Sequence, residues 1–194
     1  MSFYRNRVYP HIVTALGNPE PILKTRRQIV PLAQGTVLEI GVGPGVNLPL
    51  YDPAKVKKLY ALEPNPGMLK RAEEQRRLTK LDVEFLDLPG EKIPLHDASV
   101  DTIASTFNLC TIPGVADAIR GLARVIRPGG QFLFFEHGLS PDLPVRRWQQ
   151  RTEPSGCRHS PSVTLVAFQQ RAKACGAFRS VRFVKCQAID RSTF

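Results

Sequence analysis

Three glycines stand directly behind a stretch that has the character of a buried strand, and this feature constrains the fold most. The apolar stretch VLEI at 37–40 precedes Gly41, Gly43 and Gly45, which are separated by single residues. Because glycine has no Cβ, the chain can turn tightly here and a ligand can approach the backbone. We expect a helix to follow and to present free N–H groups to a negatively charged group of that ligand.

An acidic residue ends the next predicted strand. Glu63 comes 22 residues after Gly41, and an acid at about this distance is placed to accept hydrogen bonds from ribose hydroxyls. The dinucleotide pattern GxGxxG is not met, because Val46 stands where its third glycine belongs. The turn and the acid together predict a ligand that carries a ribose. They leave an NAD-dependent reductase as a weaker alternative.

Segments of strand and helix character alternate along the chain. This alternation predicts an α/β fold, with a Rossmann-like, doubly wound and mostly parallel sheet and helices on both of its faces. We expect strands at 36–40, 57–63, 81–86, 100–106, 131–137 and 178–186, and helices at 20–30, 64–77, 115–126 and 162–175. The sequence Arg127-Pro128-Gly129-Gly130 is expected to end the third of these helices sharply.

Composition narrows the class of protein. The chain has 194 residues, a formal net charge of +10 and no apolar run of the length that a membrane span needs. Its first residues lack the apolar core of a secretory signal, and its four cysteines are scattered, so we expect reduced thiols and a cytoplasmic location. The basic surface is compatible with peripheral membrane association, but no nucleic-acid-binding motif accompanies the charge.

Four segments resemble the class I S-adenosylmethionine (SAM)-dependent methyltransferases and occur in that family's order. They are VLEIGVGPGVN, LYALEPNPGML, PLHDASVDTIASTFNLCTI and LARVIRPGGQFLFFEHG, and together they cover residues 36–138. The chain is most similar to small bacterial enzymes of the ubiquinone/menaquinone-methyltransferase type. Within these it resembles the branch related to thiol S-methyltransferases, in which NLC and EHG…RW recur.

The resemblance implies a set of cofactor contacts for SAM, whose product would be S-adenosylhomocysteine. Glycines 41–45 would hold the methionine part, Glu39 would help to place its ammonium group, and Glu63 would bind the ribose. The adenine would lie near the start of the second predicted helix and near the PGEKIP loop. The full set of expected cofactor-binding residues is Glu39, Gly41, Gly43, Gly45, Asn47, Glu63, Pro64, Asn65, Met68, Gly90, Glu91, Phe107 and Asn108.

Methyl transfer from a sulfonium depends mostly on alignment, and a base is needed only if the acceptor arrives protonated. His137 is the candidate base, because its ordinary pKa near 6.5 suits proton removal at neutral pH. The predicted acceptor is small or lipophilic, with a thiol or a quinone-type ring carbon favoured. An amine or a phospholipid head group is the alternative, as is a non-catalytic SAM-binding module. No metal is expected.

We expect one methyltransferase domain over residues 1–194. It comprises an N-terminal helical cap at 1–35, a cofactor-binding core at 36–138 and an acceptor-side part at 139–194 that is shorter than in the family. This short tail predicts a sheet of six strands without the family's last strand. Its uncovered edge is compatible with a monomer or with pairing into a homodimer.

Overall fold

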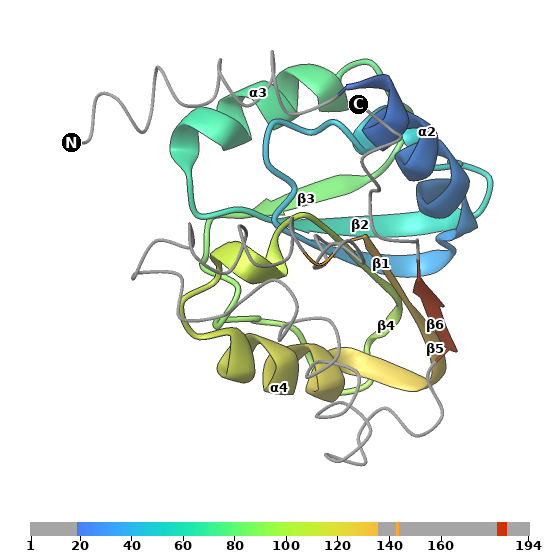
Figure 1. Ribbon diagram of the computed structural model, residues 1–194. Coiled ribbons are helices and arrows are strands. Elements are labelled where there is room, and N and C mark those ends of the chain that lie inside the picture. Colours follow the sequence, from blue (N-terminus) through green and yellow to red (C-terminus); the bar gives the residue numbers. More distant parts are fainter. Residues whose placement is uncertain (1–18, 136–142, 144–181, 186–194) are drawn as a thin grey trace.

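The computed structural model describes residues 19–135, Leu143 and residues 182–185. Figure 1 shows the described elements in colour. They are α2 (Glu20–Ile29), the 3₁₀ helix η2 (Val30–Leu32), β1 (Gly35–Ile40), the 3₁₀ helix η3 (Leu48–Leu50), β2 (Val56–Leu62), α3 (Pro66–Arg76), β3 (Val83–Leu86), β4 (Val100–Thr106), the 3₁₀ helix η4 (Leu109–Thr111), α4 (Val115–Val125), β5 (Ile126–Phe135) and β6 (Arg182–Lys185).

The strands form a six-stranded sheet in the order β3-β2-β1-β4-β5-β6, and every neighbouring pair is parallel. Helices α2 and α3 lie on one face of the sheet, and α4 lies on the other (Figure 1). The predicted doubly wound α/β fold is therefore confirmed. The predicted helix at 162–175 and the place of a seventh strand after β6 lie outside the described residues.

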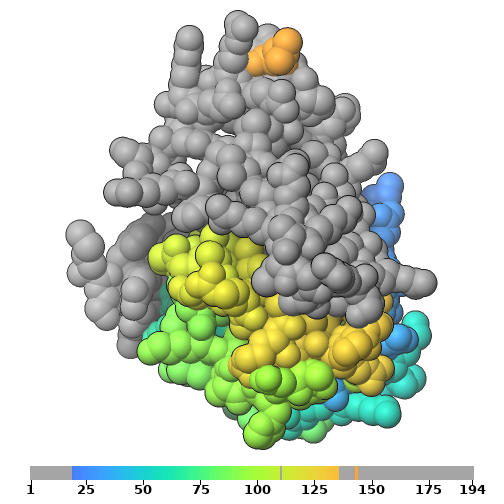
Figure 2. All heavy atoms as spheres, turned by 90° about the horizontal axis from the view of Figure 1, so that it is seen from below, coloured from blue at the N-terminus to red at the C-terminus, as the bar shows by residue number. Residues whose placement is uncertain are grey.

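Side chains that alternate along the strands divide the core between the two faces. On β1, Val37 packs with Ile22 and Ile29 of α2, whereas Leu38 packs with Ile119 and other residues of α4. The same alternation separates Phe132 and Phe134 from Leu133 and Phe135 on β5. Both faces of the central strands are buried, as is typical of a parallel sheet covered on both sides. Figure 2 shows the α4 side of the molecule, where α4 and β5 lie next to each other.

The segment after the glycine turn differs from the prediction. No α-helix follows Gly45; the chain instead makes turns and the short helix η3. The backbone N–H of Leu48 donates to the oxygen of Gly45 at 3.0 Å, and that of Leu50 donates to Asn47 at 2.8 Å, which is the tighter 3₁₀ pattern. Pro49 has no N–H to bond Gly45, so an α-helix could not continue through this position.

Strand β5 begins earlier than expected. It starts at Ile126, directly after α4, whereas the prediction placed its start at residue 131. Val100 pairs with Ile126 and Thr102 pairs with Gln131, so the intervening Arg127–Gly130 segment is a bulge in the ladder. Gly129 has a φ of +78°, which permits the bend. The Pro-Gly-Gly sequence thus ends the helix as expected but does not delay the strand.

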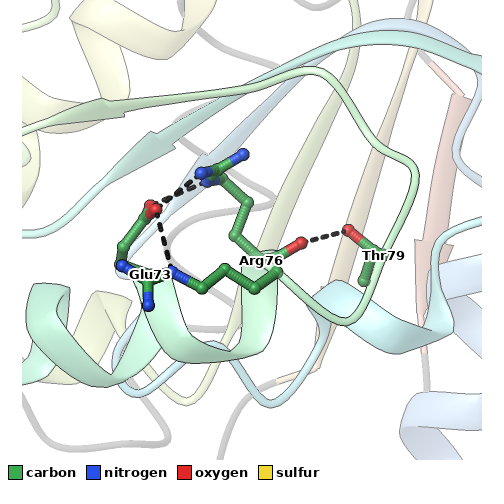
Figure 3. A network of polar contacts seen from close by, with 4 residues as sticks. Glu73, Arg76 and Thr79 are labelled. Atoms are coloured by element: carbon green, nitrogen blue, oxygen red, sulfur yellow. Dashed lines mark hydrogen bonds and ion pairs between the residues drawn. The ribbon is translucent and has the colours of Figure 1, made fainter.

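Helix ends are fixed by local hydrogen bonds. The Asn65 side chain accepts from the N–H of Gly67 at 2.9 Å and caps the start of α3. At the other end, Arg76 donates two hydrogen bonds to Glu73, and the Thr79 hydroxyl donates to the Arg76 carbonyl at 3.1 Å (Figure 3). Helix α2 differs, because its N-cap residue is Pro19, which provides no capping side chain. In the described part of the chain, no helix is both long and apolar enough to cross a membrane.

Candidate functional site: the carboxyl edge of the sheet

Parallel pairing brings the ends of the strands to one edge of the sheet. Ile40 of β1 pairs with Leu62 of β2 and with Ser105 of β4, and Leu62 pairs in turn with Leu86 of β3. The loops that follow these strands therefore emerge side by side. The order of the strands reverses between β1 and β4, and in open α/β sheets this switch point is where ligands bind.

The three glycines of the turn after β1 have positive φ values of +71°, +55° and +83°, but their surroundings differ. A Cβ on Gly41 would meet the side chain of Asn108, and one on Gly45 would meet the backbone of Ala72 at 2.9 Å. Among the residues that the structure describes, none has an atom within 4 Å of a Cβ placed on Gly43. Gly41 and Gly45 are thus needed for packing within the protein, whereas the described residues leave space beside Gly43 that a ligand could fill.

Glu63 lies between this turn and the start of α3. Its carboxylate accepts hydrogen bonds from the N–H of Gly43 at 3.1 Å and from the N–H of Asn65 at 3.0 Å. Partial burial raises the pKa of Glu63, the two backbone hydrogen bonds act against this rise, and the charge of Asp87 adds to it. The structure therefore brings the predicted ribose-binding acid directly to the predicted glycine turn.

The other residues predicted near adenine lie on two adjoining segments. Pro64 is exposed, Asn65 caps α3 and Met68 is buried in its first turns. In the loop after β3, Gly90 packs so closely that a Cβ would lie 2.8 Å from Ile112. Glu91 accepts a hydrogen bond from the N–H of Gly114 at 2.9 Å, at the start of α4. The side chain of Glu91 thus ties this loop to the start of α4.

Phe107 and Asn108 follow β4 on the other side of the switch point. Phe107 has a φ of +55°, which is unusual for a bulky side chain. Its N–H donates to the oxygen of Phe135 at 2.8 Å, and the two rings meet edge to face with centroids 4.3 Å apart. The amide of Asn108 occupies the space beside Gly41 that a Cβ would need. The segment after β4 is therefore fitted closely against the glycine turn.

Beneath these loops, a network of buried polar side chains joins the same two segments. Asn47 donates to the Glu39 carboxylate at 2.6 Å and to the Thr106 hydroxyl at 3.0 Å, and Tyr51 donates to Glu39 at 2.9 Å. Arg26 donates to Asn47 at 2.7 Å and to Thr106 at 2.6 Å. Both oxygens of Glu39 have protein partners, so its predicted contact with the methionine ammonium stays a prediction.

Burial raises the pKa of Glu39 to about 7, against the hydrogen bonds of Asn47 and Tyr51 and the charge of Arg26, which lower it. Burial and the neighbouring carboxylate of Glu39 hold the pKa of Tyr51 well above its ordinary range, so Tyr51 remains a donor. A carboxyl group in this setting changes its charge near neutral pH.

Arg26 and Tyr51 were absent from the residues expected at the site. A signal for Arg26 exists in the sequence: Ile22, Arg26 and Ile29 are the buried residues of α2, so a charged side chain occupies the apolar stripe of the helix. Charged residues in such positions are seldom buried without a partner. Tyr51 gave no comparable signal, because its partner Glu39 lies on a strand whose pairing the sequence does not show.

The expected base, His137, lies outside the described residues. Among the residues that the structure does describe, no group of three or more His, Cys, Asp or Glu side chains is placed to hold a metal ion. The site therefore consists of the turn after β1, the acid after β2 and the loops after β3 and β4.

This arrangement fits SAM. Gly43 leaves space beside the turn, and the carboxylate of Glu63 lies at the same point with oxygens that can accept from ribose hydroxyls. The predicted neighbours of the adenine are the start of α3 and the loop that contains Gly90 and Glu91. The fold is Rossmann-like, and the site is of the kind that binds a nucleoside in such folds.

Comparison with known proteins gives the family. A model of the methyltransferase domain matches residues 38–134, and the chain belongs to this family. The match runs from β1 to β5 and so includes the loops after β1, β2, β3 and β4 that make up the site. The family assignment confirms the resemblance that the sequence motifs indicated.

Two curated relatives and one solved structure are informative. The chain is 34% identical over 125 residues to the thiol S-methyltransferase TMT1B of Homo sapiens, covering 61% of this chain and 50% of that protein. It is 29% identical over 124 residues to the demethylmenaquinone methyltransferase of Clavibacter sepedonicus, covering 63% and 49%. The YcgJ protein of Bacillus subtilis has the same fold, with a TM-score of 0.62 and 22% identity over 78% of this chain and 65% of that one. The chain spans about half the length of the two curated relatives.

Proposed function

We propose that this protein transfers the methyl group of SAM to a small thiol, releasing S-adenosylhomocysteine and a methyl thioether. The observation that supports SAM as the cofactor is the hydrogen bond from the N–H of Gly43 to the carboxylate of Glu63, next to space that the described residues leave open. The similarity to a thiol S-methyltransferase supports the acceptor part.

In this proposal the chain's own residues bind and orient. Glu63 accepts the ribose hydroxyls, the turn at 41–45 carries the methionine part, and the loops after β2 and β3 enclose the adenine. When bound, SAM supplies a sulfonium methyl group that a nucleophile takes by in-line displacement. The acceptor enters beside Phe107 and Asn108, at the end of β4, because the switch point opens there. Alignment and exclusion of water provide most of the rate.

A quinone-type ring carbon is the second candidate acceptor, favoured by the similarity to a demethylmenaquinone methyltransferase. The two candidates are separated by measuring labelled methyl transfer from SAM to a small alkyl thiol, a hydroquinone and ethanolamine at equal concentrations. The proposal predicts that label appears mainly on the thiol. Label on the hydroquinone or ethanolamine alone would contradict the thiol assignment. SAM binding without transfer to any acceptor would indicate a non-catalytic module.

We assign the removal of the thiol proton to His137, two residues beyond the last described residue of β5. His137→Ala should lower kcat by about 100-fold or more and leave SAM binding near normal, because a general base contributes to the chemical step alone. The loss should shrink as the pH approaches the ordinary thiol pKa of about 8.5, where the acceptor ionises by itself. If His137→Ala lowers the rate by the same small factor at every pH, His137 serves packing and is not the base.

A further inference from the structure

Arg26 belongs to α2, which is remote in sequence from the loops of the site, yet its guanidinium lies directly beneath them. Its exposed fraction is 8%, and one terminal nitrogen donates to Asn47 at 2.7 Å and to Thr106 at 2.6 Å. Asn47 belongs to the segment after the glycine turn, and Thr106 is the last residue of β4. One side chain therefore bonds both segments that border the switch point.

The orientation of Asn47 is fixed by these contacts. Its amide oxygen accepts from Arg26, which can only donate, and its amide nitrogen donates to Glu39. If the amide were turned over, both contacts would be lost. Glu39 thus holds Asn47 from β1, and Arg26 holds it from α2, so the turn after β1 cannot shift without breaking buried hydrogen bonds.

Arg26 also supports the residue after Thr106. Its guanidinium carbon lies over the Phe107 ring, 5.6 Å from the ring centroid. The π electrons of the ring attract a cation in this position. Phe107 has a left-handed backbone, a conformation that a bulky residue keeps only when its surroundings hold it there. Such residues gather at ligand sites, and Phe107 stands beside the glycine turn.

We infer that Arg26 is a positioning residue that fixes the distance between the glycine turn and the end of β4, and so sets the width of the SAM site. The inference rests on the proposed function, because it takes SAM as the ligand of that site. Arg26 acts through Asn47, Thr106 and Phe107.

The test compares two neighbouring arginines of α2. Arg26→Met keeps an unbranched stem and removes the hydrogen bonds to Asn47 and Thr106. Arg27→Met removes the same charge from an exposed residue that pairs with Glu20. SAM affinity is measured by calorimetry and folding by circular dichroism. We expect the Kd for SAM to rise about tenfold or more in folded Arg26→Met and to stay within about twofold in Arg27→Met. Arg26→Lys should restore part of the affinity.

A merely structural Arg26 would lower the melting temperature and leave the Kd of the folded protein unchanged, and this result would overturn the inference. Should Arg26→Met not fold, Thr106→Val is measured in its place. This variant removes the hydroxyl that accepts from Arg26, and Arg26 keeps its hydrogen bond to Asn47. A Kd raised about threefold or more would support the inference, and an unchanged Kd would overturn it. If the wild-type protein binds no SAM, the proposed function itself fails. If wild type binds SAM and the variants bind it equally well, only the inference about Arg26 fails.

Discussion

The carboxyl group of Glu39 is the buried acid of the polar network beneath the site. It is almost fully buried near the end of β1, where hydrogen bonds from Asn47 and Tyr51 and the charge of Arg26 offset part of the loss of water. Its pKa of about 7 means that the unfolded chain, with an ordinary value of 4.5, releases the proton over a pH range in which the folded chain keeps it. The folded state therefore binds more protons than the unfolded state between these two values.

This difference predicts how stability changes with pH. Because the folded pKa is raised, the contribution of Glu39 to stability is lost as the pH rises from 4.5 to about 7, and it levels off above that. At about 1.4 kcal/mol per pKa unit, the loss amounts to about 3 kcal/mol. Glu39→Gln should remove this part of the pH dependence. The altered hydrogen bonds should also change the free energy of unfolding by an amount that does not depend on pH. Urea unfolding of the two proteins across this range checks it, with Glu74→Gln as the exposed control. Parallel curves for wild type and Glu39→Gln would contradict the burial argument.

Gly129, in the bulge of β5, is a matched control for Gly43 in the turn after β1. Both have a positive φ, and a Cβ on either would meet no atom within 4 Å in the part of the chain that the structure describes. Gly43→Val and Gly129→Val should therefore destabilise the fold similarly, by about 1–2 kcal/mol of backbone strain each. Only Gly43→Val should also abolish SAM binding, because its side chain would fill the space beside Glu63. Thermal unfolding and calorimetry measure the two effects, and normal SAM binding by Gly43→Val would remove the turn from the site.

At the scale of elements, the sequence predicts best where one local signal decides. The bounds of β4, at 100–106, are predicted correctly, and a loop rich in polar residues, at 89–99, marks the start of this strand in the sequence. The early start of β5 was missed, since the bulge at Arg127–Gly130 depends on pairing between Val100 and Ile126. The prediction of a helix after Gly45 is also wrong, although Pro49 in the sequence argues against an α-helix there.

In the site, too, features set by local sequence are predictable and features set by long-range packing are not. The meeting of Glu63 with the glycine turn was predictable, because the spacing of a βαβ unit fixes both positions. The bonds of Arg26 to Asn47 and Thr106 were not, because they join residues 21 and 80 positions apart through packing of α2 on the sheet. Long-range contacts of this kind leave at most an indirect trace, here a charge in an apolar stripe.

The loop after β3 and the start of α4 act as one unit through Glu91. Its carboxylate accepts from the N–H of Gly114, one of the N–H groups that a helix start leaves without an intrahelical partner. Glu91→Ala should lower the free energy of unfolding by about 1 kcal/mol, and Glu91→Gln by less, since Gln keeps an acceptor. Urea unfolding measures this, with exposed Glu74→Ala expected to stay within about 0.5 kcal/mol of wild type. Equal stabilities for Glu91→Ala and wild type would argue against the link.

At the scale of the whole molecule, the six parallel strands place every described part of the site at one edge of the sheet. Two separate cores, one beneath α2 and α3 and one beneath α4, hold the strands from both faces. The loops after β1 to β4 can therefore vary in sequence while their starting points remain fixed. This division of roles is what allows a methyltransferase domain to serve different acceptors.

Calorimetric titration of SAM into wild type, Glu63→Ala and Glu74→Ala shows whether this edge of the sheet binds SAM through Glu63. Wild type and Glu74→Ala should bind with the same affinity, within about twofold. Folded Glu63→Ala should bind about 100-fold more weakly, because two hydrogen bonds from ribose hydroxyls to a charged acceptor are lost. Equal binding by Glu63→Ala, or no binding by wild type, would contradict the account.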